Sequence, residues 1–196
     1  MRNWCSEGGA LCFKLRKASA QKYFLFAMKN NFRRIIGIDP GLASTGWGVI
    51  DYAQNRFSLV KYGVIETPAR EIHGVRLLKI FNSLNSILDE YSPTESAMET
   101  LYFAKNVTSA MGVSEARGVA TLCLAIRGIP LGEYKPNQIK QAVTGTATAD
   151  KSLVERCVKM LLGLEADPKP DHAADALAGA ITHVNFNSIS SRLKLK

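Results

Sequence analysis

Four side chains that can bind a divalent cation stand beside the predicted ends of secondary-structure elements. Asp39 follows an apolar run and precedes Pro-Gly, Glu99 ends a second apolar run, and His172 and Asp175 lie in the first turn of the last predicted helix. Converging carboxylates repel one another unless cations lie among them, and such oxygen ligands suit magnesium or manganese. Two ions of this kind promote phosphodiester hydrolysis by activating a water and stabilising the leaving oxygen. The four residues therefore predict a metal-dependent phosphodiester hydrolase.

Each of these residues also has a simpler interpretation. Asp39 has the position of a turn-capping aspartate ahead of Pro-Gly. Glu99 would be a solvated strand end, Asp175 an acid at a helix start, and His172 a structural histidine. We interpret the two other histidines of the chain, His73 and His183, as structural.

The hydrophobic pattern predicts which elements position these side chains. In chain order we expect strands at 34–39, 46–51 and 57–66, a helix through 77–91, a strand at 96–103, a helix at 108–126, a strand at 131–135, and helices at 136–143, 150–162 and 171–184. Three strands in succession predict an antiparallel meander, and the later strands, separated by helices, a parallel extension. The first and fourth strands are expected to be neighbours, which would bring Asp39 and Glu99 to one edge of the sheet.

The composition fits one folded domain. The chain has 196 residues, of which 46% are hydrophobic. Its net charge of +8 is concentrated at the start, because residues 1–34 hold eight of the 25 Lys and Arg residues and one of the 17 acids. The rest is almost neutral, so the high isoelectric point is no argument for nucleic-acid binding, and a local basic patch would have to supply it.

We divide the chain into a basic leader at 1–33, a nuclease domain at 34–186 and a polar, basic tail at 187–196. Met28 is the favoured true start, and an organelle-targeting role of residues 1–27 is the minor alternative. The four cysteines lack the spacing of a disulfide framework or a metal site, which favours the cytoplasm. No apolar stretch is long enough to cross a membrane.

Three stretches, at 36–41, 98–106 and 171–183, are similar to motifs of the RuvC Holliday-junction resolvases. Their order and spacing match that family over about residues 34 to 186. The resemblance implies an α/β fold of the ribonuclease-H-like (integrase) superfamily, with a five-stranded mixed sheet flanked by helices. It further implies a homodimer that nicks two opposed strands of a four-way DNA junction, and the RuvA–RuvB branch-migration complex as a partner in recombination and repair.

The resemblance also assigns roles to residues. Asp39, Glu99 and Asp175 match the metal-binding acids of the family, which would hold two Mg²⁺ ions per subunit, with Mn²⁺ as an alternative. His172 stands where family members carry Asp or His, and its role as a neutral ligand or a proton-transfer group stays open.

DNA contacts are implied in the same way. Tyr102 matches the aromatic residue that wedges into the junction, and Phe103 lies beside it; either ring could stack on a base or be buried under the next helix. Lys140 and Lys151 match basic positions that would contact phosphates, and the simpler interpretation is solvated surface lysines. Two further residues could extend this patch, Lys105 and Arg117.

We weigh three alternatives to the junction resolvase. A nucleotide-binding protein of the actin and sugar-kinase type would need a duplicated half with a second glycine-rich loop, which the chain lacks. A junction-binding module without nuclease activity would keep Tyr102 and the lysines and lose the acids. Another nuclease of the same fold, acting on RNA, would share the metal site, so only substrate tests separate it.

Overall fold

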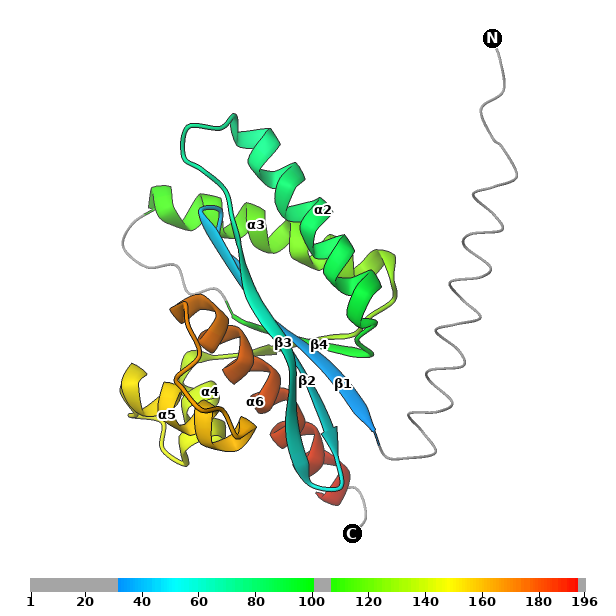
Figure 1. Ribbon diagram of the computed structural model, residues 1–196, viewed down its shortest axis with the longest axis vertical. Helices are drawn as coiled ribbons and strands as arrows, with labels where there is room; N and C mark the ends of the chain where they lie inside the picture. The colour runs from blue at the N-terminus through cyan, green and yellow to red at the C-terminus, as the bar shows by residue number, and fades with distance from the viewer. Residues whose placement is uncertain (1–31, 101–106, 194–196) are drawn as a thin grey trace, which may run out of the picture.

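The computed structural model describes residues 32–100 and 107–193 and shows one five-stranded sheet between two layers of helices (Figure 1). In chain order its elements are β1 (Arg33–Asp39), β2 (Ser44–Ala53), β3 (Arg56–Glu66), α2 (His73–Tyr91), β4 (Glu95–Glu99), α3 (Val107–Ile126), β5 (Leu131–Tyr134), α4 (Pro136–Thr144), α5 (Lys151–Leu162) and α6 (Asp171–Leu193). The type and order of the elements agree with the sequence pattern.

The strand order is β3-β2-β1-β4-β5. β1, β2 and β3 form the predicted antiparallel meander, and β4 and β5 extend it in parallel. The tight turn between β2 and β3 uses positive φ angles at Gln54 and Asn55, as a hairpin turn that matches the twist of its strands does. β1 and β4 are neighbours, with Ile38 opposite Met98, so their carboxyl ends meet at one edge.

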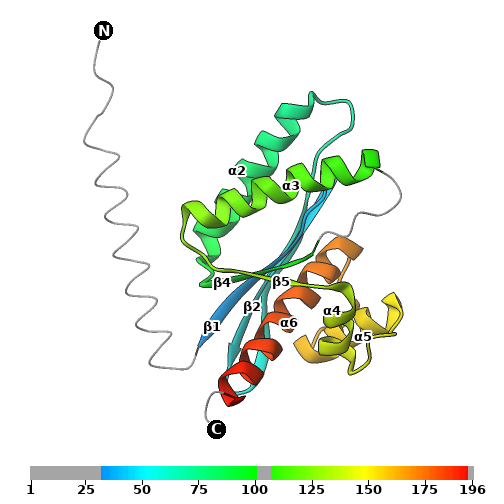
Figure 2. The same cartoon turned by 180° about the vertical axis from the view of Figure 1, so that it is seen from behind.

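The two faces of the sheet have separate cores. Helices α2 and α3 cover one face and α6, with α4 and α5 beside it, covers the other (Figures 1 and 2). Ile36 and Ile38 of β1 face α2 and α3, whereas Ile35 faces α6. Because side chains alternate along a strand, Asp39 is directed to the α6 face, and so is Glu99 two residues beyond Ala97.

Glycines allow α6 to lie directly on the sheet. Gly37 and Gly48 are cross-strand partners on β1 and β2. A Cβ at Gly37 would lie 1.8 Å from the carbonyl oxygen of Ala176, and one at Gly46 would lie 2.0 Å from that of His172. These glycines therefore set the distance between the first turns of α6 and the end of β1.

The bounds of several elements differ from the sequence pattern: β2 is longer at both ends, and α2 begins at His73. β4 ends at Glu99 instead of 103, and residues 101–103 of the predicted strand lie outside the described part, as does the leader to residue 31. Helix α6 continues to Leu193, beyond the predicted end near 184, because neither Gly nor Pro interrupts it after Gly179. The proposed division into leader, domain and tail stays a prediction. In the part of the chain that the structure describes, no helix is long and apolar enough to cross a membrane.

Candidate functional site

Asp39 stands at the carboxyl end of β1, where the strand gives way to Pro40. A proline has no N–H for a strand ladder, so the strand ends there and leaves the carboxylate at the rim of the sheet. The side chain of Asp39 is 24% exposed. The next turn is held by Thr45, whose hydroxyl donates to the carbonyl of Gly41 over 2.7 Å. Asp39 is thus fixed between a buried strand and a closed turn.

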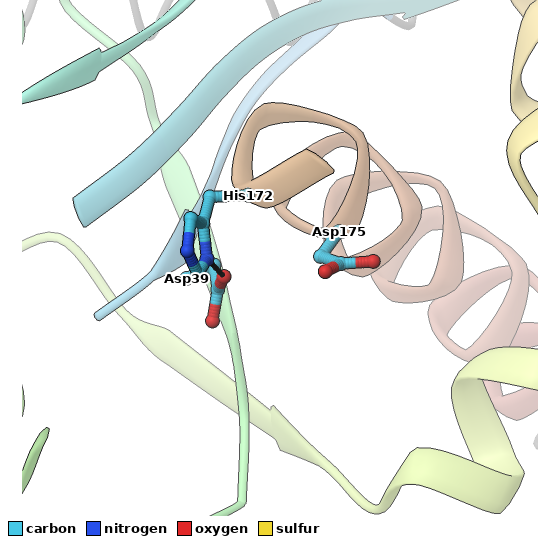
Figure 3. A group of neighbouring side chains, drawn as sticks. All are labelled: Asp39, His172 and Asp175. Atoms are coloured by element: carbon cyan, nitrogen blue, oxygen red, sulfur yellow. Dashed lines mark hydrogen bonds and ion pairs between the residues drawn. The ribbon is translucent and has the colours of Figure 1, made fainter. Parts of the chain in front are cut away.

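Helix α6 brings His172 and Asp175 to Asp39, as Figure 3 shows. Nδ1 of His172 lies 2.7 Å from Oδ2 of Asp39. One ligand atom from each of the three residues lies within 4.8 Å of the others, close enough to hold a metal ion. The predicted convergence of these three residues is confirmed.

Glu99, at the end of β4, contributes charge to the same place. Burial raises its pKa, and the charges of Asp39 and Asp175 raise it further, while Lys140 acts in the opposite sense. Glu99 does not belong to the 4.8 Å group of ligand atoms. Asp39 and Asp175 nevertheless lie close enough for their charges to disfavour ionisation of Glu99.

Lys151 partly compensates the acids. Its ammonium lies 3.3 Å from a carboxylate oxygen of Asp175 and 3.2 Å from one of Asp171. Burial raises the pKa of Asp175, Lys151 lowers it, and the charge of Asp39 raises it again, with a net rise. A single lysine therefore does not neutralise the cluster.

The donor set fits a hard divalent cation. Two carboxylates and one imidazole lie within 4.8 Å of one another at the end of β1, and the Glu99 carboxylate at the end of β4 interacts with them through its charge. Asp175 and Glu99 have raised pKa values because they are buried near like charges. A divalent cation would remove that repulsion, and carboxylate oxygens are its preferred ligands. The residues present therefore fit the metal that this chemistry needs.

The predicted DNA-contact residues have different outcomes. Lys151 and Lys140 are near the acids, the first through ion pairs and the second through its charge on Glu99. Tyr102, Phe103 and Lys105 lie outside the described residues. The guanidinium of Arg117 donates to the backbone carbonyl of Glu99, a contact that its position in a helix gave no sign of.

The two other histidines contact glutamates away from this site, as their structural interpretation implies. His183 is buried, with Nε2 2.9 Å from Glu95 and Nδ1 2.9 Å from the hydroxyl of Tyr134. His73 pairs with Glu115 across exposed surface. Both partners are distant in sequence, so spacing alone could not reveal them.

A mixed five-stranded sheet with carboxylates at the ends of its first and fourth strands, completed by the last helix, defines the ribonuclease-H-like nucleases, which hydrolyse phosphodiesters with metal ions.

Comparison with known proteins identifies the family within that class. The family model for crossover junction endodeoxyribonuclease RuvC matches residues 35–183. The chain is 55% identical to the enzyme of that name from Treponema denticola over 162 residues, 82% of this chain and 91% of the relative, and 51% identical to the one from Petrotoga mobilis over 152 residues, 78% and 93%. The structure of Thermus thermophilus RuvC in complex with Holliday junction substrate matches with a TM-score of 0.77 and 31% identity, covering 81% of this chain and 96% of that one.

The chain belongs to the RuvC family of crossover junction endodeoxyribonucleases. The resemblance, the ribonuclease-H-like fold and the enzyme class inferred from the sequence are confirmed. It is a structure-selective DNA endonuclease of recombination and repair, and the rival assignment to the actin and sugar-kinase type is set aside.

Proposed function

We propose that this enzyme resolves four-way DNA junctions by symmetric paired nicks, with Asp39, Glu99, His172 and Asp175 as its catalytic and metal-binding residues. The observation that carries the proposal is the meeting of Asp39, His172 and Asp175 within 4.8 Å, beside the like-charged Glu99, in a chain of this family. The related Thermus thermophilus enzyme has been crystallised with a Holliday junction, which supports the substrate.

The three carboxylates would hold two Mg²⁺ ions per subunit, with Mn²⁺ as the alternative. When bound, the ions supply Lewis-acid stabilisation of the transition state and lower the pKa of the attacking water. Asp39 is rigidly held between β1 and the turn closed by Thr45. Asp175 and Glu99 approach from separate elements, so the site depends on the docking of α6 onto the sheet.

His172 has two candidate roles that a substitution distinguishes. Its Nδ1 lies 2.7 Å from Oδ2 of Asp39, and this nitrogen can bind a metal only in the tautomer that leaves it without a proton. If His172 is a ligand, His172→Asp keeps a ligand atom and retains cleavage, while His172→Asn weakens it. If His172 donates a proton, both variants lose cleavage at neutral pH, because an aspartate there would already be ionised and would have no proton to donate.

Lys140 and Lys151 would contact phosphates, and Lys105 would extend their patch, with Tyr102 and Phe103 stacking on bases at the junction. Lys151 is shared between Asp171 and Asp175 in the free protein, so a bound phosphate would compete with these carboxylates. Replacing either Lys140 or Lys151 by Gln should weaken binding to every sequence and reduce the salt dependence by about one counterion.

We further propose a homodimer formed through α3 and the start of α2. The outer face of α3 presents Met111, Gly118 and Leu122, and the start of α2 adds Val75 and Leu78, four of them large and about half exposed or more. Nothing described lies within 4 Å of a Cβ at Gly118. Gly118→Arg should therefore leave the fold intact, produce monomers in sedimentation analysis and uncouple the two nicks. A Gly118→Arg dimer with paired nicks would contradict this interface.

The first experiment is cleavage of a synthetic four-way junction with Mg²⁺, beside linear duplex and an RNA–DNA hybrid, for the wild type and Asp39→Asn. Symmetric nicks on the junction alone, lost in the variant, are expected. Binding without cutting would favour the non-catalytic junction-binding module. Cleavage of the hybrid would favour a ribonuclease of the same fold.

The cellular setting follows from the family. We propose that the RuvA–RuvB branch-migration complex delivers the junction and that the reaction takes place in the cytoplasm. Both cysteines among the described residues, Cys123 and Cys157, are free thiols, which agrees with a reducing compartment. Co-sedimentation of the enzyme with RuvA–RuvB on junction DNA tests the partner.

A further inference from the structure

Arg117 of α3 reaches across to the end of β4. Its Nη1 donates to the backbone carbonyl of Glu99 over 2.6 Å, and Nη2 pairs with the carboxylate of Glu133 on β5. The Arg117 side chain is only 14% exposed. This guanidinium is therefore engaged inside the protein, and is not the solvated cation that a DNA-contact patch would need.

The carbonyl that Arg117 binds has lost its usual partner. Thr100 N–H donates to Tyr134 of β5 over 2.8 Å, and because C=O and N–H of a trans peptide point in opposite directions, the Glu99 carbonyl is directed toward β1. Continuing the register of Ile38 with Met98 by one residue places Asp39 beside Glu99. The next residue on β1 would donate to this carbonyl in a parallel ladder, but that residue is Pro40, which has no N–H.

Pro40 thus ends β1 so that Asp39 is presented at the sheet edge, and it also leaves the neighbouring strand end one hydrogen bond short. A half-buried carbonyl without a donor is costly and would let the strand end move. Arg117 supplies the missing donor from the opposite face of the sheet. Glu133 fixes the direction of the guanidinium, since two hydrogen-bonded anchors orient its planar fork.

We propose that Arg117 is a positioning residue that holds the Glu99 carboxylate in place for metal binding by fixing the backbone at the end of β4. This inference rests on the proposed role of Glu99 as a metal ligand. It assigns to Arg117 a task different from the DNA contact considered from the sequence. It also links α3, the helix of the proposed dimer interface, mechanically to the metal site.

The test measures Mn²⁺ binding to the full-length, DNA-free protein by electron paramagnetic resonance or titration calorimetry. Arg117→Lys keeps the charge, but a lysine cannot bond Glu99 and Glu133 with one rigid, planar group. The Mn²⁺ dissociation constant should therefore rise about tenfold, as is typical when a residue that orients a metal ligand is replaced. Cleavage of junction DNA should fall at low Mn²⁺ and recover as Mn²⁺ is raised. A loss of stability alone would leave the Mn²⁺ dissociation constant of the folded protein unchanged.

The matched control is Arg127→Lys, in the turn that directly follows α3. Arg127 is similarly shielded, with a side chain 18% exposed, and it also pairs with a carboxylate, that of Asp89 on α2. It lies ten residues beyond Arg117, and its side chain donates to Asp89, to Asn85 and to the backbone carbonyl of Cys123, none of which is a proposed ligand. Arg127→Lys should lower thermal stability as Arg117→Lys does, and leave Mn²⁺ affinity within about twofold of wild type.

Glu99→Gln separates failure of this inference from failure of the proposed site. If Glu99→Gln weakens Mn²⁺ binding and Arg117→Lys does not, Arg117 has no positioning role, although Glu99 remains a ligand. If Glu99→Gln leaves Mn²⁺ affinity unchanged, the ligand role of Glu99 and the inference both fail. Should Arg117→Lys not fold, Glu133→Gln gives the same test on a half-exposed side chain: weaker Mn²⁺ binding supports the inference, and wild-type binding overturns it.

Discussion

The two ends of β4 each carry a glutamate on the α6 face, and their electrostatic surroundings are opposite. Glu95, at the start of the strand, accepts hydrogen bonds from Arg33 at 2.7 and 2.6 Å and from His183 at 2.9 Å. Burial alone would raise its pKa, but these hydrogen bonds and charges hold it at about 2. Glu99, four residues later, faces other carboxylates, and its pKa is raised.

The comparison separates what stabilises the fold from what prepares the reaction. At the Glu95 end every charge has a partner, and Gly132 leaves room for His183 and Tyr134 to meet. At the Glu99 end like charges gather at the cost of stability, a pattern that is common where a protein binds a cation or performs catalysis. The same strand and the same helix, α6, form both ends, so docking of α6 assembles the catalytic end while the Glu95 end secures it.

The largest expected effect is that of Asp39→Asn, which removes a charge at the Glu99 end of β4. We call this the acidic end, because Glu99, Asp39 and Asp175 lie near one another there. This variant keeps the size of the side chain and removes the charge at the centre of the cluster. Junction cleavage with Mg²⁺ should fall about 10³-fold, because metal ions contribute several kcal/mol to the transition state. Junction binding without metal, measured by gel shift, should change little. Cleavage within tenfold of wild type would show that Asp39 is not a metal ligand.

The second effect is metal-dependent stability that belongs to the acidic end alone. Mg²⁺ at about 100 times its dissociation constant should stabilise the wild type by about 2.7 kcal/mol. The increment should disappear in Asp39→Asn and persist in Glu95→Gln. Thermal unfolding of the three proteins with and without Mg²⁺ measures it. An equal increment in all three would mean that the ion binds elsewhere.

Glu95→Gln removes the carboxylate that pairs with Arg33 at the Glu95 end of β4. Losing one charge of a largely buried pair should cost about 2 kcal/mol of unfolding free energy, while cleavage per folded molecule stays at the wild-type level. Asp89→Asn, which breaks the more exposed pair with Arg127, is the control and should cost less than about 1 kcal/mol. Chemical denaturation and junction cleavage of both variants check this. If folded Glu95→Gln cleaved junctions less well than the wild type, the Glu95 end would contribute to catalysis as well as to stability, contrary to the comparison.

The same network predicts a pH dependence. The folded pKa of Glu95 is about 2, below the ordinary value of 4.5, so its contribution to stability is complete above about 4.5 and is lost as the pH falls from there to about 2. The free energy of unfolding, measured by chemical denaturation at several pH values in this interval, should fall more steeply with falling pH for the wild type than for Glu95→Gln. Parallel curves would show that Glu95 is not the titrating group.

How far the sequence could predict this contrast depends on the range of the interactions. The convergence of Asp39 and Glu99 was predictable, because an apolar run ending in an acid marks a strand end and the strand order makes β1 and β4 neighbours. The bonds from His183 to Glu95 and from Arg117 to Glu99 cross 88 and 18 residues. They depend on how side chains pack once the layers meet, which no local pattern records.

The glycines of β1 and β2 are an intermediate case. The sequence contains Gly37, Gly46 and Gly48 in two predicted strands and an alanine-rich final helix. In the structure these glycines face α6, and their small size lets the helix approach the sheet. The helix α3 also carries small residues along its length. Ala116 and Ala120 of that helix are buried, while Gly118 is open. Small residues thus indicate close packing, and only the assembled sheet shows which helix uses it.

The smallest expected effect is a gain in stability of the metal-free protein in Glu99→Gln. Because burial and the charges of Asp39 and Asp175 raise the pKa of Glu99, its ionised form destabilises the metal-free fold, and Glu99→Gln should stabilise the protein by a few tenths of a kcal/mol to about 1 kcal/mol at neutral pH. The gain should shrink as the pH falls through the folded pKa of Glu99, since wild-type Glu99 then becomes neutral too. Glu95→Gln should change stability in the opposite direction over the same strand. If metal-free Glu99→Gln were less stable than the wild type, Glu99 would stabilise the fold. Repulsion among the carboxylates would then not destabilise the metal-free protein.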